Sequence, residues 1–193
     1  MPDLIEKAKL ILKETFGYNS FRPLQEEIIE NTLASKDGLV IMPTGGGKSI
    51  CFQLPALVQE GACLVISPLI SLMRDQVEAL KQNGVASAYL NSSLSAQEQN
   101  EIETKFLNQE IDILYVSPEK LLSRDFYQVI KSVRLNLIAV DEAHCISQWG
   151  HDFRPEYTKL GFLKKSFPKV PIMALTATAD KATRTDILNQ LGI

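Results

Sequence analysis

The chain has 193 residues, of which 45% are hydrophobic and 22% are charged, and its formal net charge is −3. This ordinary composition excludes intrinsic disorder, collagen-like structure and an extended coiled coil, and a chain of this length is expected to form one domain with a sizeable core. Domains that bind nucleic acid mainly by charge are basic. The net negative charge of this chain therefore gives no indication of nucleic-acid binding.

The N-terminal sequence and the cysteines bear on the cellular compartment. Residues 1–7 lack the apolar stretch of a signal peptide, and no run approaches the roughly 20 apolar residues needed to cross a bilayer. Cys51, Cys63 and Cys145 are far apart and show neither CxxC nor Cys/His spacing, which argues against disulfides or a zinc site. We therefore expect a cytoplasmic protein with reduced thiols and no membrane partner.

A helical preface over residues 1–35 is followed by six short apolar runs that alternate with stretches of helical period. This alternation is typical of βαβ units around a buried parallel sheet. The fold class is therefore expected to be α/β, with a mostly parallel sheet sandwiched by helices. The expected strands are 38–42, 62–66, 86–90, 112–116, 137–140 and 171–175.

Helices are indicated by apolar spacing and by capping residues. Apolar side chains recur at helical intervals in two groups, which are Leu24, Ile28, Ile29 and Leu33, and then Leu69, Met73, Val77 and Leu80. Ser67-Pro68 and Ser117-Pro118 each place a capping Ser before a Pro, and Ser95 begins a capping box with Glu98. Three helices are thus expected to begin directly after these serines.

A glycine-rich segment follows the strand at 38–42 and precedes a helical stretch, which is the context that a phosphate-binding loop requires. Its glycines let successive N–H groups surround the α- and β-phosphates, Lys48 would contact the β- and γ-phosphates, and Ser49 would ligate Mg²⁺. Met42 stands where the strict motif has Gly, so a glycine-rich turn with an incidental Lys stays open for the loop alone. The nucleotide-binding residues expected here are Thr44, Gly45, Gly46, Gly47, Lys48 and Ser49.

Two carboxylates follow the apolar strand at 137–140, at the edge where ligands bind in open α/β sheets. Strand alternation would point Asp141 and Glu142 in different directions. Asp141 could then hold the Mg²⁺ shell, while Glu142 orients the water that attacks the γ-phosphate. An isolated Asp-Glu pair is equally typical of a solvated turn, and the pairing with Lys48 favours the catalytic interpretation.

With these motifs in place, the chain resembles the RecQ family of superfamily 2 helicases over nearly its whole length, as the first of two RecA-like lobes. The segment TFGYNSFRPLQ resembles the family's N-terminal motif, which implies that Tyr18 and Arg22 sandwich adenine and that Gln25 recognises its edge. A Gln amide donates and accepts at once, so ATP would be preferred over GTP. Burial statistics alone would make Arg22 a surface charge; Phe16 and Phe21 remain packing residues.

The segment DEAHCISQWGHDFRP resembles the family's aromatic-rich loop, which contacts single-stranded DNA and couples that contact to hydrolysis. Trp149 and Phe153 offer stacking faces, and Arg154 offers a phosphate or base contact. Gln148 and His144 would relay between the loop and the bound ATP. Gln148 is therefore also predicted to be a catalytic residue. A lone Trp is also commonly a buried core anchor, so an inward-facing Trp149 stays open. The resemblance assigns DNA coupling in this loop to His144, Trp149, His151, Phe153 and Arg154.

Three further segments resemble helicase motifs. Residues 65–76 and 115–119 resemble motifs Ia and Ib, although plain helix capping explains them equally. Residues 174–179 resemble motif III, in which Thr176 and Thr178 would link the carboxylates to movement between the lobes. A Thr pair at a strand end is otherwise an ordinary strand former and cap.

The resemblance implies a monomeric 3′-to-5′ DNA helicase that uses ATP and Mg²⁺ in repair, recombination and replication, in the bacterial cytoplasm or nucleoid. Its partners would be single-stranded DNA, duplex junctions and a second RecA-like lobe in cis. That lobe, with its arginine finger, and the zinc and winged-helix modules are expected outside this chain, and Arg184 is expected to be a surface charge. An RNA-remodelling relative and a nucleotide-dependent switch are the alternative classes; the aromatic-rich loop favours DNA.

Overall fold

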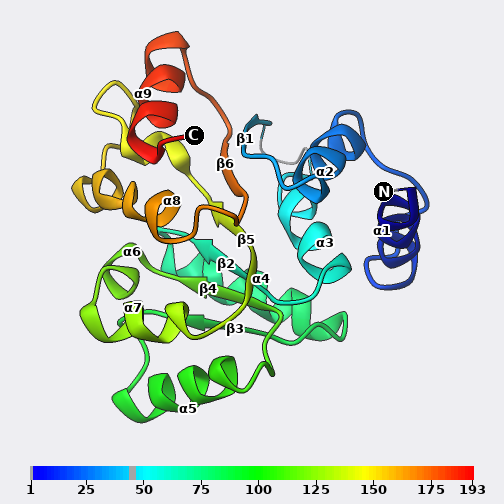
Figure 1. Ribbon diagram of the computed structural model, residues 1–193, viewed down its shortest axis with the longest axis horizontal. Coiled ribbons are helices and arrows are strands. Elements are labelled where there is room, and N and C mark those ends of the chain that lie inside the picture. Colours follow the sequence, from blue (N-terminus) through cyan, green and yellow to red (C-terminus); the bar gives the residue numbers. More distant parts are fainter. Residues whose placement is uncertain (1, 44–46) are drawn as a thin grey trace.

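The computed structural model describes residues 2–43 and 47–193. A six-stranded sheet in the order β1-β6-β5-β2-β4-β3 lies at the centre of the protein, and every strand pair in it is parallel (Figure 1). All six expected strands and the α/β class are confirmed, with strand ends displaced by one or two residues. The strands are β1 Gly38–Ile41, β2 Ala62–Ile66, β3 Ser87–Leu90, β4 Ile113–Val116, β5 Leu135–Val140 and β6 Ile172–Thr176.

Helices cover both faces of this sheet because the central strands are apolar on both sides. In β2, Leu64 and Ile66 pack into one cluster, whereas Cys63 and Val65 pack into the cluster on the opposite face. Helices α5 to α9 and two short 3₁₀ helices cover the first face, and α3 and α4 cover the second. The long helices are α3 Ile50–Val58, α4 Ile70–Gln82, α5 Ala96–Leu107, α7 Arg124–Lys131 and α9 Lys181–Leu191; the short ones are α6 Pro118–Leu121, α8 Phe162–Ser166, η1 Ala143–Ile146 and η2 Pro155–Lys159.

The preface consists of α1 (Pro2–Glu14) and α2 (Gln25–Leu33), which pack on α3 beside the sheet (Figure 1). Leu12, Ile29 and Leu54, one from each of these helices, form part of a third buried cluster. Phe16 and Phe21 are packed against it, so their expected packing role is confirmed. The preface therefore places the segment between α1 and α2 next to the start of α3.

Two of the three expected helix starts are confirmed. Ser95 Oγ accepts a hydrogen bond from the amide N–H of Glu98, whose side chain accepts one from Ser95 N. Ser117 Oγ caps α6 by accepting from the N–H of Lys120. The Ser67 prediction is wrong, because the Ser67 hydroxyl accepts from Leu69 N at 3.4 Å, ahead of the helix, and Leu69 is the residue that directly precedes α4. The chain turns only afterwards, and α4 begins at Ile70.

The first member of each expected apolar group also lies outside its helix. Leu24 precedes α2 with φ 73° and is 59% exposed, and Leu69 is the partly exposed residue before α4.

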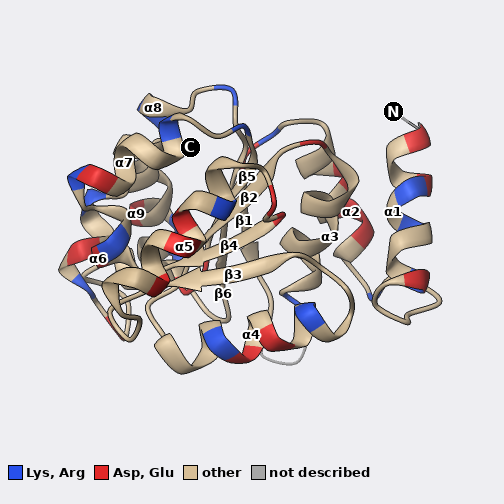
Figure 2. Cartoon of the chain, turned by 90° about the horizontal axis from the view of Figure 1, so that it is seen from below, with Lys and Arg blue, Asp and Glu red and all other residues tan. Residues whose placement is uncertain are grey.

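Acidic and basic residues are interspersed along α4 in Figure 2, in keeping with the small net charge. None of the helices in the described part of the chain is long and apolar enough to cross a membrane.

Candidate active site

The described part of the glycine-rich segment, Gly47 to Ser49, lies between β1 and α3. Thr44, Gly45 and Gly46, which are expected to bind phosphate, lie outside the described residues. Gly47 has φ 81°, a conformation in which a side chain is disfavoured, and an added Cβ would collide with the amide of Gln25. Lys48 and Ser49 directly precede α3, so their side chains lie at the positive end of that helix, as a phosphate site requires.

Asp141 follows the end of β5, and one of its carboxylate oxygens lies 4.0 Å from Lys48 Nζ. The same oxygen accepts a hydrogen bond of 2.9 Å from the backbone N–H of Glu142. Burial raises the pKa of Asp141, and the Lys48 charge opposes this shift. The structure therefore brings together the lysine and the first carboxylate that the sequence places 93 residues apart; Ser49 lines the same pocket as both.

Glu142 lies in a backbone turn directly after Asp141. Strand β5 ends at Val140, so the expected strand alternation does not extend to these two residues. Instead Glu142 adopts the left-handed conformation, with φ 51° and ψ 44°, which costs roughly 1 to 2 kcal/mol for a residue with a side chain. Its Oε2 atom lies 3.6 Å from His144 Nε2.

His144 is buried and connects the carboxylate turn to the end of β6. Its Nδ1 atom lies 2.8 Å from Thr176 Oγ1, and the Thr176 hydroxyl donates to the carbonyl oxygen of Thr178. Because that hydroxyl has a single proton, His144 Nδ1 must be the donor toward Thr176. Burial lowers the pKa of His144 and favours the neutral ring, which leaves the Nε2 lone pair facing Glu142. The two threonines and His144 are thus in one hydrogen-bonded chain.

The loop that follows places its aromatic residue outward. Trp149 is 72% exposed, which decides against the alternative of a buried core anchor. The His151 ring stacks on His144 with centroids 4.2 Å apart, and Arg154 pairs with Asp152 at 3.4 Å. Phe153 is half-buried, and Gln148 is exposed, without a bond to the carboxylate turn among the described residues.

The expected adenine residues surround a cavity of about 260 Å³ between the preface, α3 and α4. Tyr18 and Arg22 line it, and Gln25 is almost completely buried in its wall. The Gln25 side chain accepts from Arg22 N at 2.8 Å and donates to Gly47 O at 3.0 Å. A second pocket of about 380 Å³ adjoins the first through Arg22 and Gly47, and contains Lys48 and both carboxylates.

Residues 22–187 match the family model described as DEAD/DEAH box helicase. The chain belongs to this family. It is 58% identical over 98% of its length to ATP-dependent DNA helicase RecQ of Pasteurella multocida, and 56% identical over 98% to the same-named protein of Haemophilus influenzae. The predicted resemblance to RecQ helicases is thereby confirmed. The chain spans 30% and 31% of the length of these two relatives.

Solved structures confirm the α/β fold of this member of the DEAD/DEAH box helicase family. The Pyrococcus furiosus Hef helicase domain has a TM-score of 0.66 and 20% identity over 89% of this chain, which corresponds to 36% of that chain. The helicase MrfA bound to DNA has a TM-score of 0.77 and 18% identity over the full length of this chain, and 29% of its own. At such low identity the likeness concerns the fold alone.

The helicase lobe also contains contacts that sequence reasoning missed. Gln53 Nε2 lies 2.9 Å from both Gln76 Oε1 and the Tyr115 hydroxyl, which itself donates to Gln76 Oε1. This buried triangle joins α3, α4 and β4 behind the phosphate pocket. Tyr157 donates to the main-chain carbonyl of Asp141. Gln76 lies in the segment that resembles motif Ia, but no local sequence pattern predicts its contacts with Gln53 and Tyr115.

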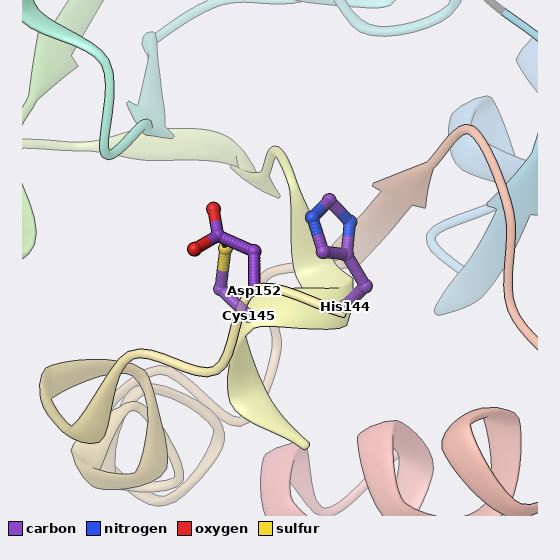
Figure 3. Close-up of side chains that lie close together, drawn as sticks. All are labelled: His144, Cys145 and Asp152. Atoms are coloured by element: carbon purple, nitrogen blue, oxygen red, sulfur yellow. Dashed lines mark hydrogen bonds between the residues drawn. The ribbon is translucent and has the colours of Figure 1, made fainter. Parts of the chain in front are cut away.

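A third unforeseen grouping consists of His144, Cys145 and Asp152, whose potential metal-binding atoms lie within 4.8 Å of one another (Figure 3). The sequence spacing did not predict this cluster. Burial raises the pKa of the Cys145 thiol to about 12, and Asp152 is paired with Arg154. Hard oxygen ligands for Mg²⁺ are offered instead by Ser49 and Asp141, which line one pocket with Lys48.

Replacing Asp141 with Asn is expected to stabilise the nucleotide-free lobe near pH 7. The folded-state pKa of Asp141 is raised above its unfolded value of 3.8. The contribution of this group to the free energy of unfolding is therefore fully present below pH 3.8, and it is lost as the pH rises through the folded-state pKa. Asn keeps an acceptor for Glu142 N without the buried charge. Urea unfolding should show a higher midpoint for Asp141→Asn at pH 7, with the gain disappearing toward pH 3.8.

The matched control is Asp75→Asn on the exposed side of α4, which should leave the midpoint unchanged at both pH values. A lower midpoint for Asp141→Asn at pH 7 would mean that the attraction to Lys48 outweighs the cost of burying the carboxylate.

Proposed function

We propose that this chain is the ATP-binding and ATP-hydrolysing lobe of a 3′-to-5′ DNA helicase that acts in repair, recombination and replication. One observation carries the proposal. Lys48 and Asp141 lie at one end of a short chain of contacts, which continues through Glu142 and His144 to the loop bearing the exposed Trp149. A hydrolysis site joined in this way to a stacking surface is the arrangement that a nucleic-acid motor needs. Two relatives named ATP-dependent DNA helicase RecQ support the choice of DNA.

The proposed chemistry assigns each polar group one task. Lys48 holds the β- and γ-phosphates, assisted by the backbone N–H groups at the start of α3. Ser49 and Asp141 would hold Mg²⁺, which neutralises charge on the phosphate oxygens when bound. Glu142 orients the attacking water, and His144, whose Nε2 atom lies 3.6 Å from the Glu142 carboxylate, relays between the loop and this site.

Base recognition is proposed for the cavity lined by Tyr18 and Arg22. Tyr18 is half exposed at its wall and offers a stacking face, while the Arg22 guanidinium offers the opposite one. Gln25 would recognise the adenine edge with its amide, which also accepts from Arg22 N and donates to Gly47 O. ATP is therefore the proposed nucleotide.

The proposed motor also requires a second RecA-like lobe in cis, which supplies an arginine finger and half of the DNA track. Single-stranded DNA and duplex junctions are the proposed substrates, and a monomer in the bacterial cytoplasm or nucleoid is the proposed state. Thr176 and Thr178 would pass lobe movement to the carboxylates, because the Thr176 hydroxyl bonds to His144 and donates to the main-chain carbonyl of Thr178.

The test uses Trp149, the only tryptophan in the chain, as an intrinsic fluorescent probe. Titration of the 193-residue chain with a thymidine oligonucleotide should quench its emission, because a base stacks on the exposed indole. A matched uridine oligonucleotide should compete more weakly. Equal or stronger competition by RNA would favour the RNA-remodelling alternative, and no quenching by either would refute a nucleic-acid contact at this loop.

A further inference from the structure

Tyr157 is a completely buried tyrosine whose hydroxyl reaches the catalytic turn. It lies in η2, after the exposed loop, and its hydroxyl donates to the main-chain carbonyl oxygen of Asp141 at 2.9 Å. Burial raises the pKa of this phenol well above its usual value, so it remains a hydrogen-bond donor throughout the physiological range. A side chain outside all the motifs above therefore contacts the peptide between the two carboxylates.

That peptide is fixed at both of its polar groups. Its N–H, from Glu142, donates to the Asp141 carboxylate, and its C=O accepts from Tyr157. Directly after it, Glu142 has the left-handed conformation, which a residue with a side chain adopts only when its surroundings impose it. The orientation of the Glu142 side chain thus depends on a peptide that Tyr157 holds.

Tyr157 is also tied to the base of the loop that carries Trp149. Arg154 N donates to Cys145 O at 2.8 Å, and Tyr157 N donates to Arg154 O at 3.0 Å. The first bond closes the segment 146–153 at its base, and the second joins that base to Tyr157. A displacement of the loop therefore has a short, hydrogen-bonded route to the Asp141 carbonyl.

We propose that Tyr157 is a positioning residue: its hydroxyl holds the Asp141–Glu142 peptide in the orientation that hydrolysis requires and makes that orientation depend on the loop 146–153. The inference rests on the proposed function, in which the loop contacts single-stranded DNA and Glu142 orients the attacking water. It adds a specific atom to that coupling, the Tyr157 hydroxyl oxygen.

The test is Tyr157→Phe in the full-length helicase, compared with Tyr127→Phe. Tyr127 is a matched control, because its hydroxyl bonds to Ser166 between α7 and α8. For Tyr157→Phe we expect kcat with single-stranded DNA to fall about 10-fold or more, as for other groups that orient a catalytic ligand. The KM for ATP should stay within about twofold, and the ratio of DNA-stimulated to basal kcat should fall.

A purely structural role would lower both rates by the same factor and leave that ratio unchanged, which would overturn the inference. Hydrogen exchange on the wild type covers the case in which Tyr157→Phe does not fold. Adding a thymidine oligonucleotide should change the protection of the peptide spanning 141–146, and unchanged protection despite DNA binding would also overturn it. If the wild type shows no DNA stimulation, the proposed function itself fails.

Discussion

Replacing Glu142 with Gln in the full-length protein is expected to lower kcat for ATP hydrolysis by about 100-fold to 10,000-fold, the usual loss when a general base is removed. Gln has nearly the same shape, but it cannot accept a proton from the attacking water. The nucleotide pocket keeps Lys48, Ser49 and Asp141, so binding of a fluorescent ATP analogue should persist. Steady-state hydrolysis and analogue titration together measure the two effects.

Glu110→Gln is the matched control, since Glu110 is exposed just before β4, at the opposite edge of the sheet. It should hydrolyse ATP at the wild-type rate. Unchanged turnover in Glu142→Gln would eliminate Glu142 as the residue that orients water. It would also leave the strained backbone of this residue without a catalytic explanation.

The 193-residue chain by itself is expected to bind ATP weakly, to hydrolyse it about 10³ to 10⁵ times more slowly than the full-length helicase, and not to unwind DNA. The physical reason is that the proposed second lobe supplies an arginine finger, which stabilises charge on the transferring phosphoryl group. Within this chain Arg184 does not substitute for it, because its guanidinium Nε donates to Ala179 O on the surface of α9.

Phosphate release by the two proteins at saturating ATP and Mg²⁺ measures this difference. Adding DNA should accelerate the full-length helicase and leave the short chain slow. Robust DNA-stimulated unwinding by the 193-residue chain would refute the requirement for a second lobe.

The sequence predicts the sheet well because the strands that matter are buried on both faces. Cys63 and Val65 must be apolar as much as Leu64 and Ile66, so the run is visible without any knowledge of its neighbours. The phosphate loop and the carboxylate pair are visible for a similar reason: their chemistry requires adjacent residues. The Ser67 prediction is wrong because its hydroxyl accepts from Leu69 N in the turn after the strand, and α4 begins only at Ile70.

Contacts between distant residues explain the rest of what sequence reasoning missed. The Tyr157 hydroxyl meets a main-chain carbonyl 16 residues earlier, and Gln53 meets Tyr115 62 residues later. Neither contact follows from helical or strand periodicity, because each depends on how elements distant in sequence pack against one another. The roles of Gln148, Lys48 and Ser49 stay predictions.

The hydrogen bonds of Gln25 have a consequence for nucleotide selection. Its side-chain oxygen accepts from Arg22 N and its side-chain nitrogen donates to Gly47 O, so one side chain joins the preface to the phosphate loop. An amide oxygen can accept twice and an amide nitrogen carries two protons, so a base edge can bind Gln25 while both of these bonds persist. Adenine bound there would add to a link that already exists between the preface and Gly47. Base selection and the position of the phosphate loop would therefore depend on the same side chain.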